Sequence, residues 1–104
     1  MNNARVFIGV CASLTGPASL LGKEMTQAIE LAVQETNRKG GIAGHEIEMI
    51  VYDDGSDIEK AETAATEFCL NENVLGVIGH YSSDTSLAAA RMHLPPHTRV
   101  FMAK

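Results

Sequence analysis

The stretch Val74-Leu-Gly-Val-Ile78 is apolar on both faces of an extended chain. Such a strand is typical of the centre of a parallel sheet, because helices cover both of its sides there. Before it, Asp57 is a good N-cap, and apolar residues at helical spacing from Ala61 to Phe68 predict a helix. After it, the alanine-rich segment Asp84 to Met92 predicts a helix that Pro95-Pro96 ends. The strand is therefore expected between two helices.

The same alternation continues outward along the chain. Glu46 to Tyr52 alternates in polarity and Val6-Phe-Ile-Gly-Val-Cys-Ala12 is rich in β-formers, so both predict strands. Between them, apolar residues from Met25 to Val33 share one helical face, and Gly40 suits the left-handed conformation that ends a helix. Arg99 to Met102 begins a fourth strand. The order β-α-β-α-β-α-β predicts an α/β fold, a doubly wound parallel sheet in three α/β/α layers with right-handed crossovers.

Composition narrows the class of protein. The 104 residues include 8 Lys+Arg and 13 Asp+Glu, a net charge of −5 with no basic cluster, so nucleic acid and anionic membrane surfaces are poor partners. Cys11 and Cys69 form no disulfide framework and cannot make a metal site alone, so both are expected to be small core residues. No cofactor is expected. The start, Met1-Asn-Asn-Ala-Arg5, lacks the apolar stretch of a secretory signal, which leaves a cytoplasmic chain or a removed signal as alternatives.

The chain stops at Lys104, within two residues of a strand's end. A complete doubly wound domain would usually add another helix and strand. Residues 1–104 are therefore expected to form a single partial domain of a larger fold.

Ligands of open α/β sheets bind beyond the carboxyl ends of the strands. Here those ends lead into Ser13 to Leu21, Asp53 to Asp57, His80 to Ser83, and the residues after Met102. Hydroxyl groups crowd the third of these loops at the start of a helix, whose first N–H groups attract a carboxylate or phosphate. The alternative is that Ser83 only caps its own helix.

A second class of function would use Asp53 and Asp54 in a flavodoxin-like phosphoacceptor or enzyme domain. That chemistry needs a third carboxylate at a neighbouring strand end, where the sequence has Gly79-His80 instead. A solvated turn followed by an N-cap is favoured for this aspartate pair. The four histidines are interpreted as surface residues, namely His45, His80, His93 and His97.

Several segments together resemble the N-terminal lobe of the periplasmic binding proteins for branched-chain amino acids (Leu, Ile, Val). These are type I solute-binding proteins that feed ABC transporters. The resemblance runs from about Arg5 to the last residue and implies two α/β lobes joined by a hinge, with an amino acid or related amide bound between them. It also implies no catalytic activity, a periplasmic or extracellular location, and an ABC transporter permease as partner. The segments that carry it are Ile8-Gly-Val10, Leu14-Thr-Gly-Pro17, Gly22, Glu35 to Gly44, Tyr52-Asp-Asp54, Val77-Ile-Gly-His80 and Ser83.

The resemblance also implies site residues. The serine matching Ser83 binds the ligand carboxylate, backbone groups at Ala103 and Lys104 hold the ligand's polar ends, and Leu21 and Tyr81 line an apolar wall. The loop before the first helix flanks the ligand side chain. The expected ligand-binding set is Ser83, Tyr81, Ser82, Leu21, Leu14, Ala103 and Lys104.

The chain also departs from this family. Ser56 and Ser82 stand where relatives often have a disulfide, and Lys104 replaces a small residue. Without a second lobe, amino-acid binding is expected to be weak or undetectable. A fourth strand left as a bare edge pairs readily with other chains, so a homodimer is expected.

Overall fold

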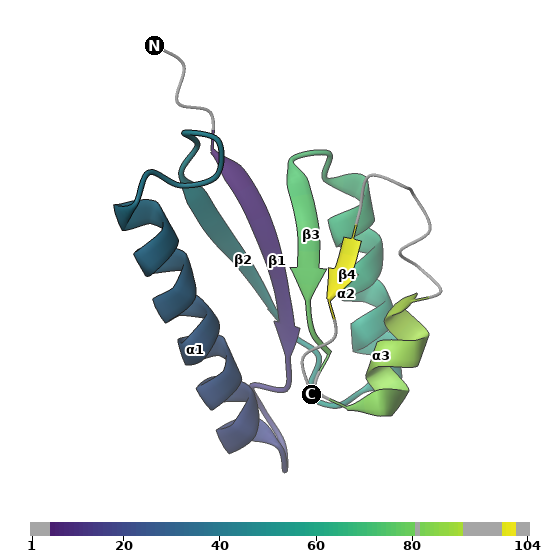
Figure 1. The fold of residues 1–104 in the computed structure, drawn as a ribbon. Coiled ribbons are helices and arrows are strands. Elements are labelled where there is room, and N and C mark those ends of the chain that lie inside the picture. The colour runs from purple at the N-terminus through teal and green to yellow at the C-terminus, as the bar shows by residue number, and fades with distance from the viewer. Residues whose placement is uncertain (1–4, 81, 91–98, 102–104) are drawn as a thin grey trace.

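The computed structural model describes residues 5–80, 82–90 and 99–101, and its elements follow the predicted order (Figure 1). The elements are β1 (Val6–Ala12), α1 (Ser19–Arg38), β2 (Ile47–Asp53), α2 (Ile58–Leu70), β3 (Val74–Ile78), α3 (Ser83–Ala90) and β4 (Arg99–Phe101). Within these described ranges, no helix combines the length and apolar character that a membrane span requires.

The four strands form one parallel sheet in the order β2-β1-β3-β4. Val10 of β1 pairs with Val51 of β2 on one side and with Ile78 of β3 on the other, so the three strands end at nearly the same level. Helix α1 covers one face of the sheet and α2 and α3 cover the other (Figure 1). This arrangement confirms the doubly wound α/β/α fold.

The main core lies between the sheet and α2. Phe68 of α2 is buried against Cys11, Val74 and Val77, and its ring meets Tyr52 edge to face with centroids 4.9 Å apart. The predicted apolar face of α2 is buried throughout, from Ala61 to Phe68. Burying these apolar side chains is the main source of stability for this half of the molecule.

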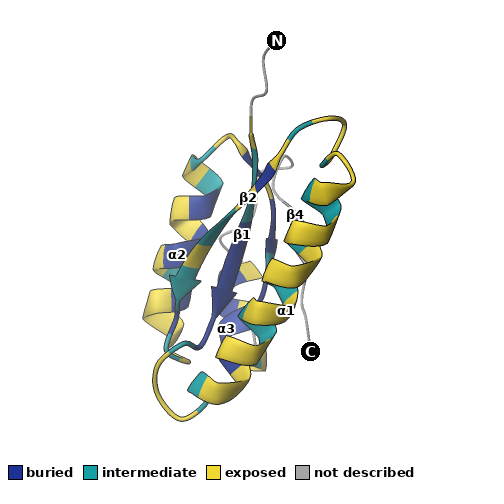
Figure 2. Cartoon of the chain, turned by 90° about the vertical axis from the view of Figure 1, so that its left-hand side faces the viewer, coloured by how far each residue is buried: buried dark blue, intermediate teal, exposed yellow. Residues whose placement is uncertain are grey.

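Helix α1 is covered much less (Figure 2). Gly22 is its buried residue, whereas Ile29 and Val33 are half-buried and Leu31 is 66% exposed. Apolar side chains of α1 and the sheet border a crevice of about 250 Å³. The predicted helical face of α1 is therefore present but only partly packed.

The ends of the elements lie close to their predicted positions. Asp57 caps α2 by accepting the N–H of Lys60, and Gly40 follows α1 with φ +107°, as predicted for a helix end. Helix α1 begins at Ser19, before the apolar pattern that starts at Met25. The pattern did not indicate this start, because the first turns of the helix are mostly exposed. The predicted stop at Pro95-Pro96 lies outside the described residues.

Candidate functional site

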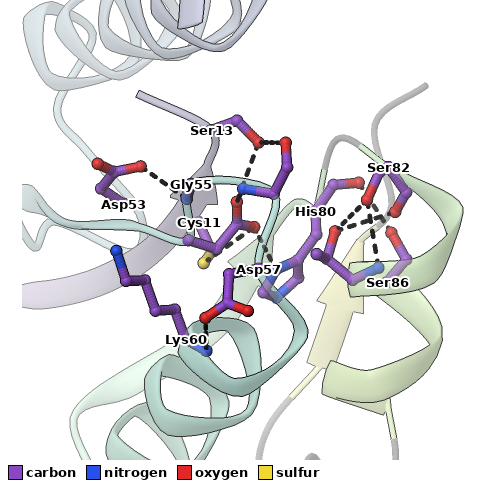
Figure 3. Close-up of polar contacts among 12 residues, drawn as sticks. Cys11, Ser13, Asp53, Gly55, Asp57, Lys60, His80, Ser82 and Ser86 are labelled. Atoms are coloured by element: carbon purple, nitrogen blue, oxygen red, sulfur yellow. Dashed lines mark hydrogen bonds and ion pairs between the residues drawn. The ribbon is translucent and has the colours of Figure 1, made fainter. Parts of the chain in front are cut away.

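Three loops meet at the carboxyl edge of the sheet (Figure 3). Residues 13–18 follow β1, residues 54–57 follow β2, and residues 79–82 lead from β3 into α3. Because β1 lies between β2 and β3, side chains that follow the three strands can contact one another.

Asp53, the last residue of β2, holds the β1–α1 loop. Its Oδ1 accepts the backbone N–H of Leu14 at 2.8 Å and of Gly55 at 2.9 Å, and its Oδ2 accepts the Thr15 hydroxyl at 2.8 Å. Partial burial opposes ionisation, but these hydrogen bonds outweigh it and lower the pKa of Asp53. The carboxylate therefore acts as a charged clamp between two loops.

Asp54, the next residue, is completely buried, so the predicted solvated turn is wrong at this position. Its Oδ1 accepts the Ser13 hydroxyl at 3.0 Å and the Ser56 N–H at 2.8 Å, while its Oδ2 lies 3.0 Å from His80 Nδ1. Burial would raise the pKa of Asp54, and the hydrogen bonds from His80, Ser56 and Ser13 overcome that effect and lower it. A buried carboxylate is tolerated here because every bond to it comes from a well-placed donor.

His80 is also completely buried, which overturns its interpretation as a surface histidine. The physical reason is its partner, since Asp54 satisfies Nδ1 inside the protein. Its Nε2 is buried without a hydrogen-bond partner among the described residues, and its backbone carbonyl accepts the Ser86 hydroxyl at 2.8 Å. His45 is half-exposed, whereas His93 and His97 lie outside the described residues.

Cys11 is a buried core residue, as predicted, but it also borders this cluster. Its Sγ lies 3.8 Å from Asp54 Oδ2, and burial, together with the nearby Asp54 charge, raises the pKa of the thiol far above its usual range. The donor atoms of Cys11, Asp54 and His80 lie within 4.8 Å of one another, a spacing that could suit a metal ion. However, a structural zinc site takes four ligands, and here Asp54 Oδ2 already accepts from both of the other groups.

The cap of α3 is Ser82, not Ser83. Ser82 Oγ accepts the Thr85 N–H at 3.2 Å and lies 2.7 Å from the Thr85 hydroxyl, and Ser82 O accepts the Ser86 N–H. Ser83 is the first residue of the helix and its side chain is exposed. The hydroxyl of Ser82 therefore satisfies the helix end, while that of Ser83 lies at the surface where the helix begins.

The other predicted site residues differ in burial, and some of them lie outside the described residues. Leu14 is half-buried in the β1–α1 loop, and Leu21 is 46% exposed in the first turn of α1. The Ser56 hydroxyl lies 2.7 Å from the Ser13 hydroxyl. Cys11 and Cys69 form no disulfide, and Cys69 is only half-buried, so its prediction as a core residue is wrong. Tyr81, Ala103 and Lys104 lie outside the described residues.

Sequence reasoning missed three members of the buried cluster, namely Ser13, Asp54 and His80. A usable signal was present, because each lies one or two residues beyond the end of one of three adjacent strands. The expected partner of the aspartates at these strand ends was a third carboxylate, whereas the structure has a histidine donor there.

Comparisons with known proteins agree on one family. A sequence profile described as "Periplasmic binding protein" matches residues 5–95. The Leu/Ile/Val-binding protein homolog 2 of Brucella abortus is 33% identical over 90 residues, which cover 86% of this chain and 24% of that protein.

Solved structures give the same result. An ABC transporter substrate-binding protein from Desulfitobacterium hafniense in complex with Leu matches with a TM-score of 0.75 and 34% identity, over 86% of this chain and 26% of that one. A leucine-binding protein from Thermotoga maritima matches with a TM-score of 0.76 and 28% identity, over 95% of this chain and 28% of that one. The chain thus spans about a quarter of the length of the relatives it matches.

Proposed function

Since the chain belongs to the periplasmic binding protein family, whose members are solute-binding proteins rather than enzymes, we propose that it supplies the N-terminal ligand-binding part of an amino-acid receptor. The observation that carries this proposal is the set of three loops joined by Asp53 and Asp54 beside the start of α3. This is the edge of an open α/β sheet at which ligands bind, and it is held together by buried hydrogen bonds.

The proposed ligand is a branched-chain or related amino acid. The start of α3, with Ser83 exposed and Ser82 as cap, suits a carboxylate because the first N–H groups of a helix point outward there. Leu14 and Leu21 offer apolar surface to the ligand side chain. The proposal extends the contact set to Tyr81, Ala103 and Lys104. Support for the ligand class comes from the Desulfitobacterium relative, which is described in complex with Leu.

We also propose that residues 1–104 are part of a larger lobe. The relatives are about four times as long, and the crevice beside α1 leaves apolar side chains partly uncovered. A fully packed domain would bury such a surface. The residues bordering the crevice include Ile8, Ile29, Val33, Ile47 and Ile78.

The partner and location follow from the family. We propose that the whole receptor acts outside the cytoplasmic membrane, delivers its amino acid to an ABC transporter permease, and catalyses no reaction. A phosphoacceptor function of Asp53 and Asp54 is not favoured, because neighbouring donors already bind both carboxylates.

A homodimer of this chain is proposed on separate grounds. Among the described residues, strand β4 is at the edge of the sheet, and an edge strand offers unpaired backbone groups to a second chain. Native mass spectrometry at micromolar concentration tests this. A dimer peak that grows with concentration is expected, and a monomer throughout would refute the proposal.

The binding proposal is tested by titrating the isotopically labelled chain with L-leucine and recording ¹H–¹⁵N correlation spectra. Millimolar L-leucine is expected to shift amide signals of residues 13–18 and 82–86, and Ser83→Ala is expected to weaken the response. Leucinamide, which lacks the carboxylate, should shift these signals much less. Thr66→Ala, which removes an exposed hydroxyl on α2, is the matched control. Because a single lobe is expected to bind weakly or undetectably, the comparison between variants decides, and a leucine response of equal size in the wild type and in Ser83→Ala would overturn the proposed contact.

A further inference from the structure

We propose that the buried Asp54–His80 pair positions the loop between β3 and α3. The pair fixes the start of α3 relative to the loops that follow β1 and β2. The inference rests on the proposed function, because it concerns the same edge of the sheet. It assigns a role to two residues that need not touch the ligand.

The first argument is that the carboxylate of Asp54 joins all three loops. Asp54 follows β2, and it accepts hydrogen bonds from Ser13 after β1, from Ser56 in its own loop, and from His80 after β3. The side chains of Asp54 and His80 are both fully buried. The distances of 2.8 to 3.0 Å for these three bonds are those of well-formed hydrogen bonds.

The second argument is that His80 is connected to α3 as well as to the sheet. Its side chain binds Asp54, while its backbone carbonyl accepts the hydroxyl of Ser86 in the first turns of α3. Ser82, two residues after His80, caps the same helix through Thr85. Movement of the His80 ring would therefore be transmitted to the helix start within a few residues.

The third argument concerns the proton on His80. A proton on Nδ1 is donated to the Asp54 carboxylate, whereas Nε2 finds no partner among the described residues. The bond to Asp54 therefore requires a hydrogen on Nδ1. The pair therefore constrains the orientation of the His80 ring, because the hydrogen bond forms only when Nδ1 faces Asp54.

A bulky residue that merely fills space at position 80 would serve the core equally well, and two variants separate these roles. His80→Leu keeps an apolar side chain of moderate size but removes the donor. His80→Asn is smaller, yet its amide nitrogen can occupy roughly the place of Nδ1. A positioning role predicts that Asn preserves the loop better than Leu, whereas a packing role predicts the reverse.

The first readout is hydrogen–deuterium exchange of the 104-residue chain, which requires no ligand. In His80→Leu, the peptide covering residues 79–88 is expected to exchange about tenfold faster than in the wild type, and in His80→Asn within about threefold of it. Ser86→Ala cuts the connection to α3 while leaving Asp54 paired, so it is expected to raise exchange in the same peptide and keep the chain folded. Thr66→Ala should leave this peptide unchanged.

The second readout is the L-leucine titration of the same variants. If the wild type responds to leucine, His80→Leu should weaken the response by about tenfold and His80→Asn by much less. Exchange in His80→Asn that equals or exceeds that of His80→Leu would overturn the inference, as would unchanged exchange in Ser86→Ala if His80→Leu does not fold. A wild type that does not respond to leucine bears on ligand binding by the single lobe and not on the Asp54–His80 pair, because the exchange data decide the positioning role without ligand.

Discussion

Gly22 in the first turn of α1 lies directly against the backbone carbonyl of Ser13. A Cβ atom at position 22 would come within 1.7 Å of that oxygen. Ser13 also donates its hydroxyl to the buried Asp54. Ser13 therefore contacts both the start of α1 and the buried Asp54 of the candidate site.

This contact predicts that Gly22→Ala is destabilising despite the higher helix propensity of alanine. The clash involves backbone atoms, so either α1 or the β1–α1 loop must move, at a cost of about 2 kcal/mol or more in the free energy of unfolding. Thermal and urea unfolding followed by circular dichroism measures the change. The exposed neighbour Lys23→Ala is the control and should stay within about 0.5 kcal/mol of the wild type. Equal stability of the two variants would show that α1 does not pack against Ser13.

The buried carboxylate predicts a distinct acid response. The pKa of Asp54 is lowered in the folded chain relative to its ordinary value of 3.8, so the stabilisation that it provides is present above that value. It is lost as the pH falls through the lower folded value. Asp54→Asn should be less stable than the wild type at neutral pH by about 2–4 kcal/mol, because His80, Ser13 and Ser56 lose a charged acceptor.

Urea unfolding at a series of pH values tests this acid response. As the pH falls below about 4, the wild type should lose stability more steeply than Asp54→Asn, since the variant lacks this titrating group. Asp53 titrates in the same range, but it is present in both proteins and cancels in the comparison. Parallel curves for the two proteins would mean that the Asp54 pKa is not lowered by folding.

The fold could be predicted from local pattern because each element carries its own signal. The strand over Val6–Ala12 and the buried face of α2 were both predicted residue by residue, since apolar periodicity and the Asp57 cap are properties of short segments. The parallel direction of the strands follows from their alternation with helices, whereas their order in the sheet, β2-β1-β3-β4, was not predicted. The exposure of α1 could not be predicted in this way, because it depends on what else covers that face of the sheet.

The site was harder to predict because its connections are non-local. Asp54 and His80 are 26 residues apart, and neither neighbouring sequence indicates that both side chains turn inward. Aspartate side chains are mostly exposed in proteins and histidine side chains are intermediate. Burial of this pair becomes favourable through the bond between them and, for Asp54, through the bonds from Ser13 and Ser56. The cap was misplaced by one residue for a simpler reason, since Ser82 and Ser83 are chemically equivalent candidates for the start of α3.

Asp53 offers a prediction for the neighbouring loop. Asp53→Ala removes the acceptor for Leu14, Thr15 and Gly55, so the β1–α1 loop should loosen and the free energy of unfolding should fall by about 1–2 kcal/mol. Hydrogen–deuterium exchange of residues 13–18 should rise. Thr15→Val removes only the hydroxyl bond and should have a smaller effect on both quantities. If Thr15→Val matches Asp53→Ala, the backbone hydrogen bonds contribute nothing measurable.

The two cysteines should differ sharply in reactivity. Cys11 is fully buried, and burial together with the nearby Asp54 charge raises the pKa of its thiol far above the usual range, so almost no thiolate is available at neutral pH. Cys69 is only partly buried, and burial raises its thiol pKa less.

Timed alkylation with iodoacetamide followed by mass spectrometry of peptides measures both rates. Cys69 is expected to react at least about tenfold faster than Cys11 in the folded chain, and the two rates should converge in denaturant. Cys69→Ser removes the faster site, so the remaining label reports Cys11 alone. Since Cys11 contacts Asp54, its labelling also measures opening of the buried cluster, and His80→Leu should accelerate it. Labelling of Cys11 as fast as that of Cys69 in the folded wild type would show that the cluster is open to solvent.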